Sequence, residues 1–391
     1  MSLIPVSAYF ASLCCLLVGY VWGYLHILKH GTNWKPPTLS KTKPERRVNV
    51  VIPVRDEIDL LRTKLLNVRS QTYPPQLLDV ILVDSSEGSS SQQVVEEISK
   101  DSHGMSIEVI KDDAKRGKYY ALNLAFRRCR DQFVAITDVD VLANVDAVEK
   151  LMQNFQNPQV GAVSAMEGTA SQFGELRSYR NLYNTLRIAE SELSSVLMCE
   201  SNLAIYRRDL VTELPANTQC DDFELTKSVL AKNYRAIYDP RVIFCENQEA
   251  LTRNRMLSQK LRRGRANTHA LLKTLTERNV HFAPLFKNRI LPFEVFIHVA
   301  APILLVACLV SLLLVAVSSP ILAIGAALIP AALAVSFGSV IMRMISPSKR
   351  LKERLQMGFE TIYAFVEYNL ILFVAFVLAV FAGPQTSWRR S

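Results

Sequence analysis

The chain has 391 residues, of which 49% are hydrophobic and 21% are charged, and its formal net charge is +9. This length allows one large domain or two smaller ones, and it is enough to bury a substantial core. Much of the excess positive charge lies beside predicted membrane ends, where anionic lipid headgroups attract it. No RNA- or DNA-binding motif occurs, so we predict no nucleic-acid partner. The 7 cysteines show no C-x-x-C spacing, which argues against a zinc site and a disulfide framework.

The N-terminal segment is apolar from residue 5 to residue 27 and is followed by lysines. At roughly 1.5 Å per residue it is long enough to cross the ~30 Å core of a bilayer. A cleaved signal peptide carries its basic residues before the apolar stretch, whereas here Lys29 and Lys35 follow it. We therefore predict that residues 1–30 form an uncleaved membrane anchor.

The C-terminal third contains further apolar stretches, separated by a turn and by a basic loop. We predict membrane spans at residues 296–317, 321–341 and 358–381, within a membrane region of residues 296–383. Before them, residues 280–295 combine prolines with phenylalanines and are predicted to form interfacial helices. The basic loop runs from Arg343 to Arg354. Because basic loops remain on the cytosolic side, the polar middle of the chain is predicted to face the cytosol.

In the middle of the chain, short apolar runs alternate with helical patterns, and we assign residues 45–275 to one domain. The predicted strands are 48–54, 80–83, 107–110 and 133–136. The predicted helices between them are 58–70, 92–100 and 118–128. This alternation predicts an α/β domain with a mainly parallel sheet, whose ligands bind at the carboxyl ends of the strands. Neither G-x-G-x-x-G after the first strand nor a P-loop occurs, which disfavours hydride transfer and P-loop phosphate binding.

Two carboxylates follow the fourth predicted strand in the motif Asp138-Val139-Asp140. Side chains two residues apart in an extended chain point to the same side. Such a pair can share a divalent cation, and Mg²⁺ or Mn²⁺ held in this way also binds substrate phosphates. The alternative is that these residues simply form a turn.

Two further residues at strand and helix ends carry possible chemistry. Asp84, at the end of the second strand, can accept a hydrogen bond from the imide N–H of uracil, or it can belong to the start of a helix. Lys118 can meet a diphosphate as a point charge, or it can be a solvated lysine at a helix start. The residues alone leave both alternatives open.

Six motifs now stand in one order along the chain. They are Val51-Ile52-Pro53-Val54-Arg55-Asp56-Glu57, Val83-Asp84-Ser85, Arg116-Gly117-Lys118-Tyr119-Tyr120-Ala121-Leu122-Asn123, Thr137-Asp138-Val139-Asp140, Cys220-Asp221-Asp222-Phe223-Glu224-Leu225 and Gln259-Lys260-Leu261-Arg262-Arg263. This order resembles the membrane-bound inverting family-two glycosyltransferases, the group of hyaluronan, chitin and cellulose synthases and ceramide glucosyltransferase. The resemblance covers roughly residues 48–270, and it implies a Rossmann-like A-type fold with transmembrane helices, one N-terminal and about three C-terminal.

The resemblance implies a role for each matching residue. Asp222 matches the general base that takes the proton of the acceptor hydroxyl, with Asp221 as the minority alternative. Asp138 and Asp140 would hold Mg²⁺ or Mn²⁺ as a Lewis acid for the leaving diphosphate. The residues implied in donor binding are Pro53, Arg55, Glu57, Asp84, Lys118, Asp138 and Arg262. Those implied on the acceptor or diphosphate side are Asp221, Gln259 and Arg263.

The chain departs from the family pattern at two positions. The usual motif Q-x-x-R-W ends in a tryptophan that stacks on the acceptor sugar, and here Arg263 replaces it. The missing indole puts processive elongation in doubt. Asp56 stands where asparagine is common.

These observations favour an inverting transferase that moves a sugar from a nucleotide-diphospho-sugar, with a UDP-sugar preferred, to a hydroxyl of a lipid or lipid-linked saccharide. A processive polysaccharide synthase is the alternative acceptor class. A non-catalytic membrane transport or lipid-binding protein is the alternative from another class, and the intact Asp138, Asp140 and Asp222 argue against it. A nucleotidyltransferase is disfavoured because the first loop lacks glycines. We expect a multi-pass protein of the plasma membrane, in contact with membrane lipids, with a cytosolic catalytic domain.

Overall fold

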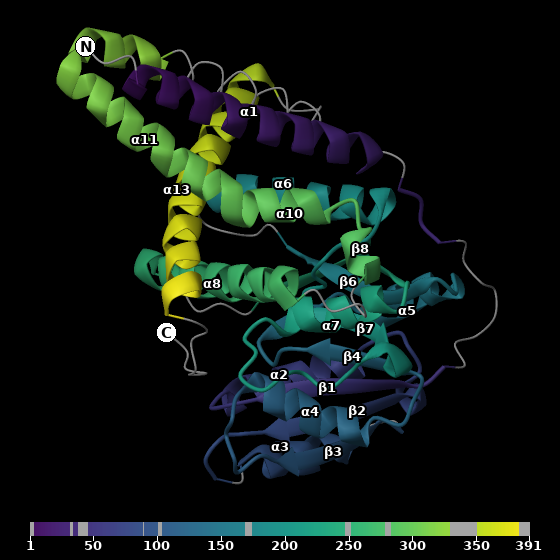
Figure 1. Ribbon diagram of the computed structural model, residues 1–391. Coiled ribbons are helices and arrows are strands. Elements are labelled where there is room, and N and C mark those ends of the chain that lie inside the picture. Colours follow the sequence, from purple (N-terminus) through teal and green to yellow (C-terminus); the bar gives the residue numbers. More distant parts are fainter. Residues whose placement is uncertain are drawn as a thin grey trace.

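The computed structural model describes residues 4–31, 34–37, 46–88, 90–100, 104–168, 174–246, 252–277, 283–328 and 350–382. A sheet domain with helices on both faces forms one end of the molecule, and long helices form the other (Figure 1). The N-terminal helix lies at the far end from the sheet domain, beside the C-terminal helices.

The described strands form an 8-stranded sheet in the order β3-β2-β1-β4-β7-β6-β8-β5. Their bounds are β1 Val48–Val54, β2 Leu78–Asp84, β3 Ser106–Lys111, β4 Phe133–Thr137, β5 Val141–Ala143, β6 Val160–Glu167, β7 Leu203–Arg207 and β8 Arg235–Glu246. Strands β3, β2, β1 and β4 pair in parallel, as do β6 and β8. Strand β7 is antiparallel to both of its neighbours, and β5 is antiparallel to β8. The predicted mainly parallel α/β sheet is confirmed.

Burial explains why the central strands read as continuous apolar runs in the sequence. Every residue of β1 is buried, because helices cover both faces of the sheet there. The covering helices of the sheet domain are α2 Ile58–Arg69, α3 Ser90–Ser99, α4 Lys118–Arg128, α5 Ala147–Gln153, α6 Gly174–Leu193, α7 Asp221–Ala231 and α8 Arg253–Glu277. Short 3-10 turns occur at Pro75–Leu77, Asn154–Gln156 and Arg208–Leu210.

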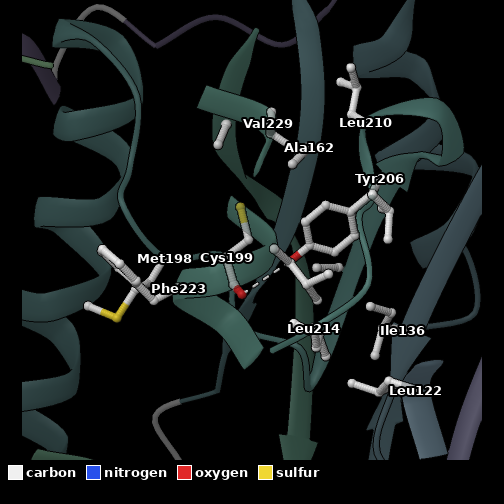
Figure 2. Packing of buried hydrophobic residues seen from close by; sticks show 14 of the residues in the cluster. Leu122, Ile136, Ala162, Met198, Cys199, Tyr206, Leu210, Leu214, Phe223 and Val229 are labelled. Atoms are coloured by element: carbon white, nitrogen blue, oxygen red, sulfur yellow. Dashed lines mark hydrogen bonds between the residues drawn. The ribbon is translucent and has the colours of Figure 1, made fainter. Parts of the chain in front are cut away.

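The sheet separates two hydrophobic cores. One core includes Leu122 of α4, Ile136 of β4 and Val229 of α7. Figure 2 shows Tyr206 at the centre of this core, where its hydroxyl donates to the carbonyl oxygen of Cys199 over 3.5 Å. The other core lies under α2 and α5 and includes Leu61. The two cores lie on opposite faces of the sheet and hold the helices against it.

Three helices in the described part of the chain are long and apolar enough to cross a membrane: Ile4–Lys29, Leu291–Ser318 and Leu351–Phe381. They correspond to α1 Ile4–Gly31, the run of α10 Leu291–Val295, the π-helix Phe296–Ala300 and α11 Ala301–Ser318, and α13 Leu351–Phe381. The short α9 Ala283–Phe286 precedes them. Residues 320–328 are also helical, but the rest of the predicted span 321–341 lies outside the described residues, as do Arg343 and Lys349.

The long helices pack closely on one another. A Cβ atom on Gly19 of α1 would lie 2.1 Å from the ring of Phe296, so only glycine permits this approach. The hydroxyl of Tyr20 on α1 donates to Oδ1 of Asn369 on α13 over 3.1 Å. Two residues before Asn369, Glu367 contacts α8, where the Nζ of Lys260 lies 2.6 Å from its Oε2. Helix α13 therefore joins α1 to α8.

Candidate active site

The carboxyl edge of the parallel strands gathers most of the predicted site residues. Strands β1, β2 and β4 run in the same direction and end at one edge of the sheet. Pro53 is the next-to-last residue of β1 and pairs with Val83 of β2. Asp84 ends β2, and Asp138 follows β4 directly. Ligands of open α/β sheets bind at this edge.

A lysine joins two acidic motifs that are far apart in the sequence. The Nζ of Lys118 lies 2.9 Å from Oδ1 of Asp138 and 3.1 Å from Oδ2 of Asp221. Lys118 is the first residue of α4, and Asp221 is the first residue of α7. Burial alone would lower the pKa of Lys118, but Asp138, Asp221 and Asp222 raise it above its usual value. Lys118 is therefore a permanent cation at the centre of the site.

Asp222 lies in the first turn of α7, next to this lysine. Its Oδ1 accepts a hydrogen bond of 2.7 Å from the backbone N–H of Ser201. Burial, and after it the charge of Asp221, raises the pKa of Asp222 to about 7, against the opposing effects of Lys118 and Ser201. A carboxyl group with this pKa can exchange a proton near neutral pH, which a general base must do.

Asp138 and Asp140 offer oxygen ligands of the kind that Mg²⁺ and Mn²⁺ prefer. Both side chains are partly exposed, whereas Val139 between them is buried. Within the described residues, no group of three or more His, Cys, Asp or Glu side chains is arranged to hold a metal by itself. The pair therefore fits a cation that takes its remaining ligands from water and from a substrate, which is how proteins commonly hold Mg²⁺.

A cavity of about 440 Å³ opens between the loops that follow β1 and β2. Its lining includes Arg55, Asp56, Ser85, Ser86, Glu87 and Lys115. The two loops are joined, because the backbone N–H of Asp56 donates to Oγ of Ser86 over 2.8 Å. Asp56 adopts a left-handed conformation with φ 58°, which asparagine and aspartate tolerate better than most residues. The volume lies within the range typical of small-molecule sites. Glu57 lies beside the cavity loop as the N-cap residue of α2.

Asp84 directly precedes the cavity-lining residues Ser85 and Ser86 and is 1% exposed. Its Oδ1 accepts from the backbone N–H of Ser86 at 2.8 Å, and its Oδ2 accepts from Ser91 and from Lys111. Burial would raise the pKa of Asp84, but the hydrogen bonds from Ser91 and Ser86 outweigh burial and lower it. Asp84 is thus an ionised carboxylate that orders the cavity loop.

Helix α8 brings the last motif to the site. Burial, and after it the charge of Arg263, lowers the pKa of Arg262, while Asp221 and Asp138 oppose this change. Arg262 therefore belongs electrostatically to the cluster around Lys118. The guanidinium of Arg263 lies 3.4 Å from Oε1 of Glu246, and its side chain is 52% exposed. Gln259 lies on the same helix, about one turn before Arg262.

Lys64 of α2 is not among the predicted site residues, yet its side chain is buried beside the Asp138–Asp140 motif. Its Nζ donates to Oγ1 of Thr137 and to the carbonyl oxygen of Val141, each at 2.6 Å. Burial lowers the pKa of Lys64 to about 7, although Asp138 and Asp140 favour its charged form. The signal was its position on the apolar stripe of α2, since Leu61, Leu65 and Val68 share that face.

Comparisons with known proteins indicate the family of the sheet domain. A family model for glycosyl transferase family 2 matches residues 49–214. Hyaluronan synthase of Streptococcus pyogenes is 28% identical over 182 residues, covering 44% of this chain and 43% of that protein. N-acetylglucosaminyltransferase of Azorhizobium caulinodans is 27% identical over 216 residues, covering 50% of this chain and 54% of that protein. The chain thus spans about half the length of the curated relatives it matches.

A solved structure resembles nearly the whole chain. It is the mannosyltransferase PcManGT from Pyrobaculum calidifontis in complex with GDP-Man and Mn²⁺, with a TM-score of 0.66 and 25% sequence identity. The similarity covers 91% of this chain and 97% of that chain, so it includes the sheet domain and apolar helices. Residues 49–214 form a glycosyl transferase family 2 domain, homologous to hyaluronan synthase and N-acetylglucosaminyltransferases.

Proposed function

We propose that this protein is a membrane-embedded, metal-dependent inverting glycosyltransferase. It transfers a sugar from a nucleotide-diphospho-sugar to a hydroxyl group of a lipid or lipid-linked saccharide. The observation that carries this proposal is the cluster in which Lys118 contacts Asp138 and Asp221, with Asp222 beside them. This cluster combines a cation for a diphosphate with a carboxylate of pKa near 7 for an acceptor hydroxyl.

Each residue has a role in a single displacement at the anomeric carbon. Asp222 takes the proton of the acceptor hydroxyl. At the same time the hydroxyl oxygen bonds to the anomeric carbon, and the bond from that carbon to the diphosphate breaks. Lys118 and Arg262 bind the leaving diphosphate, the arginine through its planar fork. Asp138 and Asp140 would hold Mg²⁺ or Mn²⁺, which supplies Lewis-acid stabilisation of the departing phosphate charge.

The cavity after β1 and β2 is the proposed site of the nucleoside. Its position at the carboxyl edge of the sheet supports this assignment, with Arg55 in its lining. Pro53, Glu57 and Asp84 would shape the donor site from the ends of β1 and β2. Membranes containing the protein, incubated with a panel of UDP- and GDP-sugars with and without Mn²⁺, should release nucleotide with one class of donor. No release with any donor would contradict the proposed function.

In this proposal Asp221, Gln259 and Arg263 form the acceptor and diphosphate side of the site. Arg263 offers a charged fork held near Glu246 in place of a flat aromatic surface, which supports a lipid-linked or short product. Similarity to hyaluronan synthase supports the alternative, a processive polysaccharide synthase. Products labelled from the donor and separated by size distinguish the two, because a processive enzyme yields long chains.

The pKa of Asp222 predicts a pH dependence. A general base must be ionised, so kcat/KM should rise with pH through about 7 and reach a plateau above that value. The sign for stability is opposite: the raised pKa favours the protonated carboxyl in the folded state, so this group's contribution to folding is lost as the pH rises through about 7. Steady-state values of kcat/KM, measured between pH 5.5 and 8.5 in roughly half-unit steps on each side of that pKa, test for this rise. A rate that falls across this window would contradict the assignment.

We propose that the protein lies in the plasma membrane with the sheet domain in the cytosol. The three long apolar helices support membrane insertion, and Lys352 and Arg354 at the start of α13 support a cytosolic location for that end. In a variant whose exposed cysteines Cys14, Cys15 and Cys245 are replaced by serine, Lys352→Cys should react with an impermeant thiol reagent only after the membrane is opened. Reaction in sealed cells would contradict this topology.

A further inference from the structure

The inner face of α2 carries polar side chains where an amphipathic helix normally places apolar ones. Lys64 and Gln71 are only 2% and 8% exposed, and Asn67 between them is partly buried. Lys64 and Asn67 are three residues apart on one face of α2, and Gln71 follows just after the helix ends at Arg69. We call Lys64, Asn67 and Gln71 the α2 spine.

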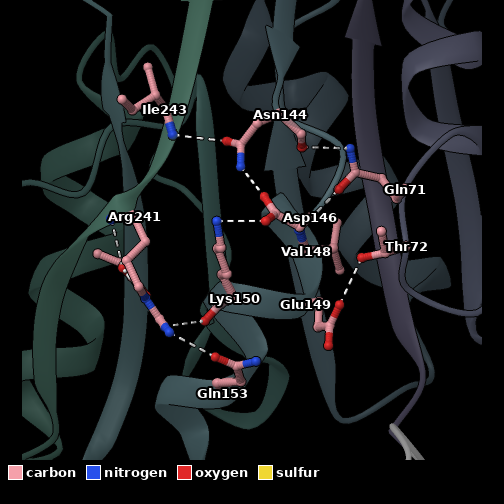
Figure 3. A network of polar contacts seen from close by, with 11 residues as sticks. Gln71, Thr72, Asn144, Asp146, Val148, Glu149, Lys150, Gln153, Arg241 and Ile243 are labelled. Carbon is pink, nitrogen blue, oxygen red and sulfur yellow. Dashed lines mark hydrogen bonds and ion pairs between the residues drawn. The ribbon is translucent and has the colours of Figure 1, made fainter. Parts of the chain in front are cut away.

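The whole α2 spine contacts one stretch of chain, residues 137–148. Asn67 exchanges two hydrogen bonds with the backbone of Ala143, at 2.9 Å and 3.1 Å. Gln71 donates to the carbonyl oxygen of Asn144 and accepts from the N–H of Val148, each over 3.1 Å. Figure 3 shows this end of the spine, where Gln71 points toward Asn144 and Val148. The spine therefore fastens the chain that leaves β4.

Lys64 is the member of the spine closest to the active site. Its two partners, Thr137 and Val141, lie on either side of Asp138–Asp140. Its Nζ therefore links the two ends of the loop that carries both aspartates. The hydroxyl of Thr137 in turn donates to the carbonyl oxygen of Asn202 over 2.8 Å. Asn202 follows Ser201, whose backbone N–H holds the carboxylate of Asp222. A continuous path thus leads from Lys64 to both acidic motifs.

An ammonium group in this place is costly for stability alone. Burying a cation against neutral oxygens costs free energy, and an apolar side chain of similar length would fill the space at lower cost. The negative charges nearby that favour the ammonium are those of Asp138 and Asp140. The position of Lys64 is therefore explained by the acidic loop rather than by the packing of α2.

We propose that Lys64 is a positioning residue, which fixes the metal-binding loop 137–141 and, through Thr137 and Asn202, the segment that holds Asp222. This inference rests on the proposed function for the meaning of the two motifs. It adds that one buried lysine, through the hydrogen bonds from its Nζ, sets the position of the proposed metal ligands and of the general base together.

The test compares two buried residues of the α2 spine, Lys64 and Gln71, each changed to methionine. Hydrogen exchange of the full-length, metal-free protein should become at least tenfold faster at residues 138–143 and 200–203 in Lys64→Met, by an estimate of about 1.4 kcal/mol for a lost buried hydrogen bond. Strand β2 should keep its protection. Gln71→Met should loosen residues 144–148 and leave 200–203 unchanged.

Turnover gives the second measurement. Because a misplacement of about 1 Å can cost on the order of 10²-fold in rate, kcat of Lys64→Met should fall by about that factor, while Gln71→Met should remain within about threefold of the unchanged protein. If Lys64→Met does not fold, Thr137→Val removes the hydroxyl that links Lys64 to Asn202 and takes its place in both measurements.

Two results would overturn the proposal: unchanged exchange with unchanged kcat, or faster exchange spread evenly over the sheet domain including β2. The second would make Lys64 a contributor to general stability only. If the protein without substitutions has no transferase activity, the proposed function is contradicted. The hydrogen-exchange pattern of the metal-free protein would still decide the role of Lys64.

Discussion

Asp222→Asn should lower kcat by roughly 10²–10⁴-fold, the usual loss when a general base is removed, and leave donor affinity nearly unchanged. The amide is close to the carboxylate in shape and can still accept the hydrogen bond from Ser201, so the start of α7 should keep its structure. The proposed donor contacts belong to other residues, chiefly Lys118 and Asp138. Nucleotide affinity measured by calorimetry, beside the transfer rate, tests both parts of the expectation.

Asp221→Asn is the matched control, because it is the neighbouring carboxylate on the same helical turn. Asp221 contacts Lys118 at 3.1 Å, so its loss should weaken donor binding more than it slows the chemical step. Near-normal turnover in Asp222→Asn together with an inactive Asp221→Asn would assign the base to Asp221. Weak nucleotide binding in Asp222→Asn would instead place that residue in the donor site.

Asp140→Ala should abolish transfer at any Mg²⁺ or Mn²⁺ concentration. With only two protein carboxylates in the proposed metal site, removal of one leaves too few ligands to hold the cation against water. The same loss should follow removal of metal from the unchanged protein by excess EDTA, and added Mn²⁺ should restore activity. Full turnover in EDTA would contradict metal dependence.

Asp146→Ala is the control for a lost carboxylate outside the site. Asp146 is the N-cap residue of α5, and its Oδ2 lies 2.6 Å from the Nζ of Lys150 (Figure 3). Its pKa is lowered, because the ion pair with Lys150 outweighs the effect of burial. Its loss should lower the melting temperature slightly and leave transfer unchanged, so activity loss confined to Asp140→Ala would be specific to the metal site.

Local sequence patterns predicted the first half of the sheet because burial on both faces makes these strands continuous apolar runs. The bounds of β1 agree with the predicted residues 48–54, and β2 to β4 contain the predicted strands. The second half of the sheet was harder to predict from the sequence. The antiparallel pairing of Phe133 with Arg207 joins distant parts of the chain, and β5 spans only Val141–Ala143, too short for a periodic pattern to develop.

The candidate site likewise contains residues that the sequence indicates and contacts that it does not. Side chains such as Asp138 and Asp222 stand in recognisable motifs, and the structure brings both close to Lys118. The contact from Ser201 is made by a backbone N–H, which no residue type reveals in advance. Lys64 was overlooked because a lysine on a helix is normally assigned to the solvent-facing side. Its position within the apolar stripe was the available clue.

The hydrogen bond between Tyr20 and Asn369 has a consequence for the order in which the molecule is assembled. The partners are 349 positions apart, so α1 leaves the ribosome long before α13 exists. Domains form from the N-terminal end during synthesis, so α1 can pack on α6 of the sheet domain, where Ile27 meets Leu182 and Leu186, while α11 and α13 are still missing. The close approach at Gly19 likewise waits for Phe296. The first helix to be made therefore completes its packing only when the last helix has been made.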